Sequence, residues 1–131
     1  MKLAFSTLGC PNYSWKDIRS MAKDLGFDGI EIREIGDKFA SSPFSPEKCA
    51  STLKKLESIH IEIPCLSTGC CLKFTDKREE NIDEIKRYIE IAAKLKTPYI
   101  RILGDLKAAP EGEVDDASIA DEIKALVPVA E

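Results

Sequence analysis

The sequence is poor in the residues that hold metal ions. Only one histidine, His60, occurs among 131 residues, with five cysteines at positions 10, 49, 65, 70 and 71. Cys65, Cys70 and Cys71 lack the short paired spacing of a structural zinc site. Because the cysteine count is odd and no secretory signal is apparent, we expect reduced thiols that behave as small buried hydrophobes.

Long apolar runs and clusters of one charge are also missing. No run approaches the roughly 20 apolar residues that cross a bilayer, and the N-terminus does not resemble a signal peptide. We therefore expect a cytoplasmic protein with no membrane partner. The net charge is −4, and the 19 Lys and Arg residues are scattered. Nucleic-acid binding requires clustered cations, so a small polar substrate or a protein partner is favoured.

No glycine-rich phosphate loop follows the first apolar segment, because residues 8–12 match neither a dinucleotide-binding nor a P-loop fingerprint. A doubly wound nucleotide fold is therefore less favoured than a barrel or part of one. What is present is a strand, loop and amphipathic helix repeated four times. This alternation predicts parallel strands with right-handed crossovers. The expected strands are 3–7, 29–33, 62–67 and 99–103, and the expected helices begin near 14, 45, 78 and 118.

Local signals refine this prediction. Ser14 with Asp17 three residues later resembles a capping box that starts the first helix, and Gly26 ends that helix. Pro64 lies inside the third strand, which predicts a bulge or a late strand start. The last residues stop without a capping residue. We therefore expect one partial domain over residues 1–131, with four β/α units and a cut inside the fourth.

Several segments in order carry a family resemblance. Residues 3–11 with Ser14-Trp15, then 25–33, 81–95 and 98–104, resemble the first half of xylose isomerase-like barrel proteins. That superfamily includes sugar-phosphate isomerases and epimerases, hydroxypyruvate isomerase, inosose dehydratase and endonuclease IV. The resemblance implies an α/β fold, the parallel (β/α)₄ half of a TIM barrel. It also implies that the full-length protein is an isomerase or epimerase of a small sugar or sugar acid.

The resemblance further implies a divalent metal, Mn, Mg, Zn or Co, in the full-length protein. Family members hold it with two Glu, one Asp and one His on later strands, and no position here matches these ligands. We therefore expect no catalytic residue, metal ligand or cofactor in this chain, which alone should be inactive. His60 is no substitute, because it lies at the end of the second helix, where the helix dipole favours a cation.

Charged and polar residues of the strands form two candidate groups. Glu31 and Arg101 lie on alternate strands, which share interior layers in such barrels, and we predict a structural ion pair rather than a substrate contact. A second group follows the strand ends and would form the rim of the substrate pocket. Its members are Thr7, Arg33, Ser67, Cys70 and Asp105, with Cys10, Thr68 and Cys71 nearby. Polar loop residues that simply face water are an equally good interpretation of each one.

Two other functions stay open. An endonuclease IV-like repair enzyme would use the same frame, but the acidic charge and the lack of a basic, aromatic rim disfavour it. A non-catalytic half-barrel could instead work by self-association, because four parallel strands cannot close a barrel. Phe5, Cys65 and Leu103 would then face solvent from the inner wall. We therefore expect a homodimer that buries more than ~1,000 Å².

Overall fold

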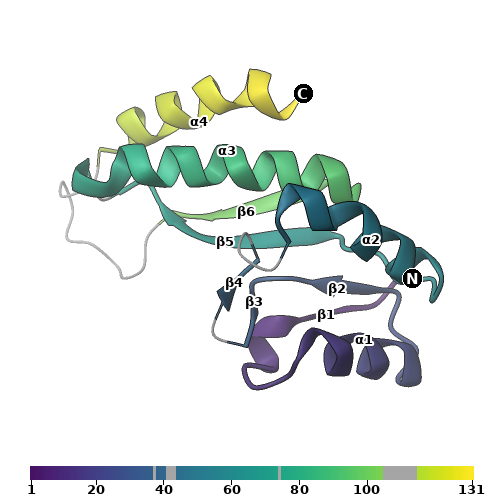
Figure 1. Ribbon diagram of the computed structural model, residues 1–131. Coiled ribbons are helices and arrows are strands. Elements are labelled where there is room, and N and C mark those ends of the chain that lie inside the picture. The colour runs from purple at the N-terminus through teal and green to yellow at the C-terminus, as the bar shows by residue number, and fades with distance from the viewer. Residues whose placement is uncertain (37, 41–43, 74, 105–114) are drawn as a thin grey trace.

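The computed structural model describes residues 1–36, 38–40, 44–73, 75–104 and 115–131. Four parallel strands alternate with four helices, as the sequence pattern predicts (Figure 1). The strands are β1 (Ala4–Ser6), β2 (Gly29–Glu31), β5 (Cys65–Cys71) and β6 (Tyr99–Leu103). The helices are α1 (Trp15–Asp24), α2 (Pro46–Glu57), α3 (Arg78–Leu95) and α4 (Asp116–Ala130).

The strands follow one another in chain order across a curved sheet. β1 pairs with β2 and β5 pairs with β6, both in parallel. Bridges between Gly29 and Glu62 and between Ile32 and Leu66 join the two pairs. The Ser67 amide also donates to the Ile32 carbonyl at 2.8 Å. The resulting order, β1-β2-β5-β6, is the arrangement of half a parallel barrel.

Strand β5 differs from its predicted limits at both ends. It begins at Cys65 instead of residue 62, so the late start expected from Pro64 is confirmed. It then continues to Cys71 through an irregular register, since Ser67 pairs with Arg101 while Cys71 pairs with Leu103. Extra residues on one strand form a bulge, which bends that strand and redirects its side chains.

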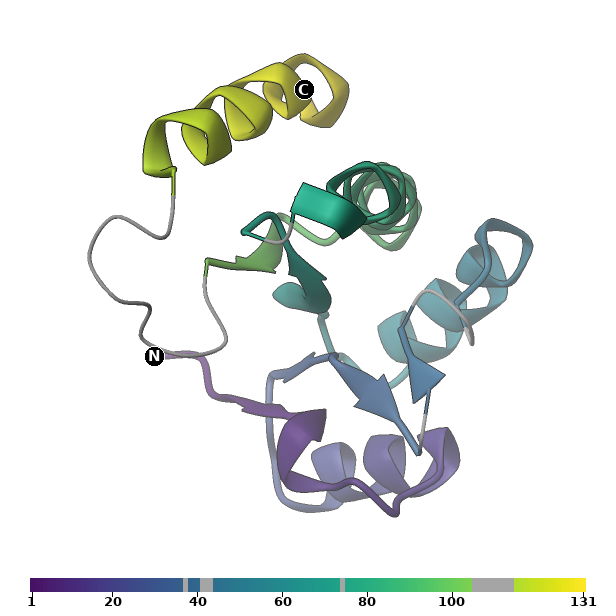
Figure 2. The same ribbon diagram turned by 90° about the vertical axis from the view of Figure 1, so that its left-hand side faces the viewer.

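Figure 2 shows the four helices along the outer side of the sheet. The core lies between the sheet and these helices, because every second residue of a strand points to the outer side of the sheet. Ile30, Ile32 and Leu66 are fully buried there against Ile18 of α1 and Ile91 of α3. Burial of this kind contributes roughly 1.5–3 kcal/mol for each large apolar side chain. A second cluster, with Cys70, Leu72, Ile85 and Leu126, packs α3 and α4 against the end of β5.

Phe5 corrects the prediction for the inner wall. It is paired with Ile30 and therefore points to the outer side, where its ring lies 4.9 Å from that of Phe27. The inner positions of β1 are Ala4 and Ser6 instead. The prediction of Phe5 as an inward residue is wrong because the strand register, not residue size, fixes the side to which each residue points.

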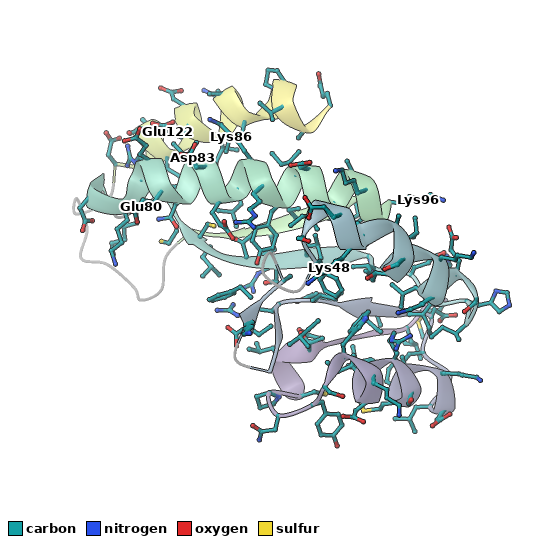
Figure 3. The ribbon with its side chains drawn as sticks, viewed as in Figure 1. Lys48, Glu80, Asp83, Lys86, Lys96 and Glu122 are labelled. Atoms are coloured by element: carbon teal, nitrogen blue, oxygen red, sulfur yellow. The ribbon has the colours of Figure 1, made fainter. Side chains whose placement is uncertain are left out.

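The capping box of the first helix is confirmed, since Ser14 and Asp17 exchange backbone and side-chain hydrogen bonds. All five cysteines are free; Cys49, Cys70 and Cys71 are buried, whereas Cys10 and Cys65 are only half-buried. Within the described ranges, no helix is long and apolar enough to cross a membrane. Charged side chains such as Lys86 and Glu122 lie on the helix layer (Figure 3).

Candidate functional site

The hydroxyl of Thr7 links the carboxyl ends of β1 and β2. This residue opens a 3₁₀ turn (Thr7–Gly9) directly after β1 and is almost fully buried. Its Oγ1 accepts hydrogen bonds from the amides of Arg33 at 3.0 Å and Glu34 at 3.3 Å. Thr7 thus lies at the predicted rim, with its hydroxyl engaged in holding the end of β2 beside the end of β1.

A short hairpin follows β2 at this edge and was missed by the sequence prediction. Strands β3 (Glu34–Ile35) and β4 (Lys38–Phe39) pair antiparallel. Gly36, which lies between them in the sequence, has φ 65°. The glycine at a left-handed position was the available signal. Two-residue strands are too short to show an alternating pattern, which explains the omission.

The hairpin positions an arginine over an aromatic ring. The Arg33 guanidinium lies 5.9 Å from the centroid of Phe39, within the range of a cation–π contact. Phe39 in turn lies against Gly69, where an added Cβ would come within 2.8 Å of the ring. Arg33 Nε is 3.5 Å from a Glu34 carboxylate oxygen and is buried without a hydrogen-bond partner in the described structure.

The bulge of β5 is held by Thr68. Its hydroxyl donates to the Arg101 carbonyl at 2.9 Å and accepts from the Cys70 amide at 3.1 Å. Nearby, the Asn81 side chain donates to the Cys71 carbonyl at 3.0 Å. The irregular end of β5 is therefore satisfied by side chains where the strand ladder is interrupted.

The inner wall carries a row of polar groups. Ser6 Oγ donates to Glu31 Oε1 at 3.1 Å, and Arg101 Nη1 donates to Ser67 Oγ at 3.3 Å. Cys65 is on β5, the strand between β2 and β6. Burial raises the pKa of its thiol, the Glu31 carboxylate raises it further and the Arg101 guanidinium lowers it. The wall thus presents a carboxylate, a thiol and a guanidinium on neighbouring strands.

The predicted Glu31–Arg101 pair is not in direct contact. The ion pairs of the described residues do not include one between them, and each side chain has a hydroxyl partner instead. Arg101 is exposed and Glu31 is half-buried, whereas burial of both was expected. The strand β5 separates them, and no described residue forms a wall opposite the inner face.

The other rim predictions have different outcomes. Ser67 is buried beneath Arg101 and Cys70 lies in the helix-side cluster with Leu72, so neither side chain opens onto a pocket. The bulge explains the position of Cys70, because it shifts the alternation beyond Ser67. Asp105 lies outside the described residues. Arg33 follows β2 at this edge, and its side chain is 19% exposed.

The described residues do not fit a metal ion. Across the described ranges, no three His, Cys, Asp or Glu side chains come together as a metal-binding group. The carboxylates of the site, Glu31 and Glu34, are separately engaged with Ser6 and Arg33. No catalytic step through a metal is therefore derived from this chain.

The family model for xylose isomerase-like TIM barrels matches residues 20–131. The chain belongs to this family. Comparison of the sequence with curated proteins finds no match. The family assignment therefore rests on the model match, and the fold agrees with it.

Solved structures confirm the fold. The structure described as IOLI protein with a binding zinc atom has a TM-score of 0.77 at 21% identity, covering 100% of this chain and 48% of that one. The probable 3-DHS dehydratase AsbF of Bacillus anthracis, involved in petrobactin synthesis, has a TM-score of 0.69 at 20% identity, and the match covers 98% of this chain and 47% of that one. A xylose isomerase domain protein from Planctomyces limnophilus has a TM-score of 0.66 at 13% identity, and the match covers 85% of this chain and 43% of that one. The chain thus spans about half the length of these barrels.

Proposed function

We propose that these residues form the N-terminal half of a sugar or sugar-acid isomerase or epimerase, and that they supply one wall of its substrate pocket. Membership of the xylose isomerase-like family supports this proposal. So does the position of the polar rim, since active sites of such barrels lie at the carboxyl ends of the strands. One solved neighbour contains a zinc atom, and a divalent metal in the whole enzyme would need ligands other than the described residues, which form no metal-binding group.

The placement of Arg33 carries the proposal. Its guanidinium lies beside Phe39 and Glu34 at the carboxyl-end edge of the strands, where barrels of this class have their active sites. The Nε–H of the guanidinium is buried beside Glu34, so the four N–H donors on its two Nη atoms are the ones left for a substrate. A fixed fork of donors suits the hydroxyl and carboxylate oxygens of a sugar acid. Its role is to bind and orient the substrate.

A titration followed by two-dimensional NMR tests this role. A panel of myo-inositol, a ketose and a sugar acid is added to the chain, and the amide shifts of residues 33, 34 and 104 are followed. We expect millimolar binding of the sugar acid at this edge, weakened about tenfold or more by Arg33→Gln. Arg87→Gln is the matched control, because Arg87 is exposed on the outer helix α3. Equal binding by both variants, or no shifts at this edge, would refute the role of Arg33.

The endonuclease-like alternative gains no support from the surface charges. Described lysines pair with neighbouring acids, as in Lys86–Asp83, Lys94–Glu90 and Lys124–Asp121. Interspersed charges of this kind do not build the basic stripe that a phosphate backbone requires. A non-catalytic half-barrel that self-associates has a specific observation in its favour, the open inner face of the sheet.

A further inference from the structure

Among the residues that the structure describes, nothing pairs with the outer edges of β1 and β6 or covers the inner face of the sheet. In the described structure β1 pairs only with β2, and β6 pairs only with β5. Tyr99 on the inner side of β6 is 70% exposed, and Leu3 just before β1 is 52% exposed. Free strand edges and exposed apolar side chains of this size are surfaces that proteins cover by association.

The solved barrels indicate what has to cover this face. The chain aligns along its whole length with less than half of the IOLI structure, at a TM-score of 0.77. A parallel barrel of this class closes with eight strands. Another four-stranded half, with the same curvature and the same helical outer layer, is therefore the shape that complements this one.

The register places Glu31 and Arg101 at one level of such a barrel. The bridge between Ile32 and Leu66 puts Glu31 opposite Cys65, and Cys65 pairs with Tyr99. Arg101 is two residues farther along β6. Strands of an eight-stranded barrel with a shear of eight tilt so that the level advances about one residue per strand. From β2 to β6 the level crosses two strands and therefore advances two residues, so Arg101, and not Tyr99, lies at the level of Glu31.

We propose that a second copy of this chain covers the inner face, with β6 of each copy beside β1 of the other. The second and fourth strands of both copies then contribute one interior layer, as alternate strands do in these barrels. That layer contains two copies of Glu31 and two of Arg101, alternating in sign around the barrel. A two-fold dimer is the commonest way in which a soluble chain buries such a surface.

Charge complementarity favours a second copy as the occupant. Among the described residues, Glu31 and Arg101 have hydroxyl partners only, and Arg101 uses one donor of five in the hydrogen bond to Ser67. Enclosing either charge without an opposite one would be costly. In the two-fold barrel each Glu31 has an Arg101 on both sides, so the layer is neutral. This inference concerns the chain by itself and does not depend on the proposed reaction.

Light scattering coupled to size exclusion, between 1 and 100 μM, tests the assembly. We expect a dimer for the natural sequence. Arg101→Glu makes the layer wholly acidic and Glu31→Arg makes it wholly basic, and each should raise the dissociation constant about a hundredfold or more. Arg87→Glu on the outer face of α3 is the matched control and should leave the dimer unchanged. The double exchange, Glu31→Arg with Arg101→Glu, restores alternation and should restore the dimer.

Mixing the two single variants separates this layer from a general effect on folding. One variant has only arginines in the layer and the other only glutamates, so together they should form a heterodimer that neither forms alone. Circular dichroism confirms that each variant is folded. A monomeric natural chain would overturn the proposal. It would also be overturned if the mixed variants stayed apart, or if a carboxyl-terminal half from a family barrel displaced the second copy at equal concentration.

Discussion

Thr68 and Arg101 are joined across the irregular end of the sheet. The Thr68 hydroxyl donates to the Arg101 carbonyl at 2.9 Å, while it accepts from the Cys70 amide at 3.1 Å. Thr68 is fully buried, so water cannot replace either partner. One hydroxyl therefore satisfies two backbone groups that the bulge removes from the strand ladder.

Thr68→Val should destabilise the fold by roughly 1–3 kcal/mol, because it leaves a buried amide and a buried carbonyl with no partner while the shape is kept. Thr97→Val is the matched control. Thr97 is also buried, but its Oγ1 has no hydrogen-bond partner in the described structure. Its replacement should be neutral or slightly stabilising. Urea unfolding measures both, and equal losses would contradict the bridging role of Thr68.

The repeated pattern of the sequence predicted the four β/α units. Burial between the sheet and the helices requires apolar residues at alternate positions in each strand and at every third or fourth position in each helix. Ile30 and Ile32 had to alternate in a strand, and Ile18 and Ala22 had to share a helix face. The limits of β6 were predicted without error, and those of α3 closely. Strand ends were less predictable where a side chain instead of the ladder satisfies the backbone, as at Thr68.

The candidate site was only partly predictable for the same reason. Arg33 was predicted at the rim because it ends the expected strand 29–33. The hairpin that places Phe39 over it depends on two-residue strands and on contacts with Gly69, 30 residues away in the sequence. Such contacts leave no periodic trace. Glu31 and Arg101 lie on the inner wall on either side of β5, but sequence alone could not show that their hydrogen-bond partners would be Ser6 and Ser67.

Gly69 allows the Phe39 ring to lie on β5. A Cβ at this position would come within 2.8 Å of the ring, so Gly69→Ala should displace Phe39 and weaken its contact with Arg33. Because Phe39 is 40% exposed and can move, we expect a loss of only about 1 kcal/mol. In a Phe39→Ala background the same change should cost almost nothing. A double-mutant cycle by thermal unfolding measures the coupling, and additive effects would show that the ring does not limit position 69.

The contribution of Asp17 to the stability of the α1 N-terminus depends on pH. Hydrogen bonds from the Ser14 side chain and backbone lower the pKa of the Asp17 carboxyl. A carboxyl with a lowered pKa in the folded state adds stability above its unfolded pKa, about 3.9, and that stability is lost as the pH falls through the folded value. Asp17→Asn should therefore lower the melting temperature at pH 7 and have a diminishing effect below about pH 4.

The same change at Asp24, at the opposite end of α1, serves as the control. A negative charge at a helix C-terminus is unfavourable, so Asp24→Asn should not lower the melting temperature at pH 7. Scanning calorimetry between pH 2 and 7 resolves the difference. A deficit of the Asp17 variant that persisted unchanged at pH 2 would mean that capping geometry, and not ionisation, is responsible.

Cys65 reports on the two charges of the inner wall. Burial raises the pKa of its thiol, the Glu31 carboxylate raises it further, and the Arg101 guanidinium lowers it. The thiolate is the reactive form, so Glu31→Gln should lower this pKa and speed alkylation near pH 8, whereas Arg101→Gln should slow it. The rates are measured against pH by mass spectrometry of the peptide that contains Cys65, at dilutions where the chain is monomeric.

Cys49 on α2 is the internal control. Burial chiefly raises the pKa of its thiol, and its charged neighbours are Lys94, Glu47 and Glu90. Its alkylation should be the same in both variants. Opposite shifts at Cys65 require that both Glu31 and Arg101 lie close to this thiol, because distant, solvent-screened charges would change its pKa little. An unchanged alkylation rate in either variant would show that the charge removed is not close to Cys65. At concentrations where the second copy binds, Cys65 should become protected in the natural chain and stay reactive in Arg101→Glu.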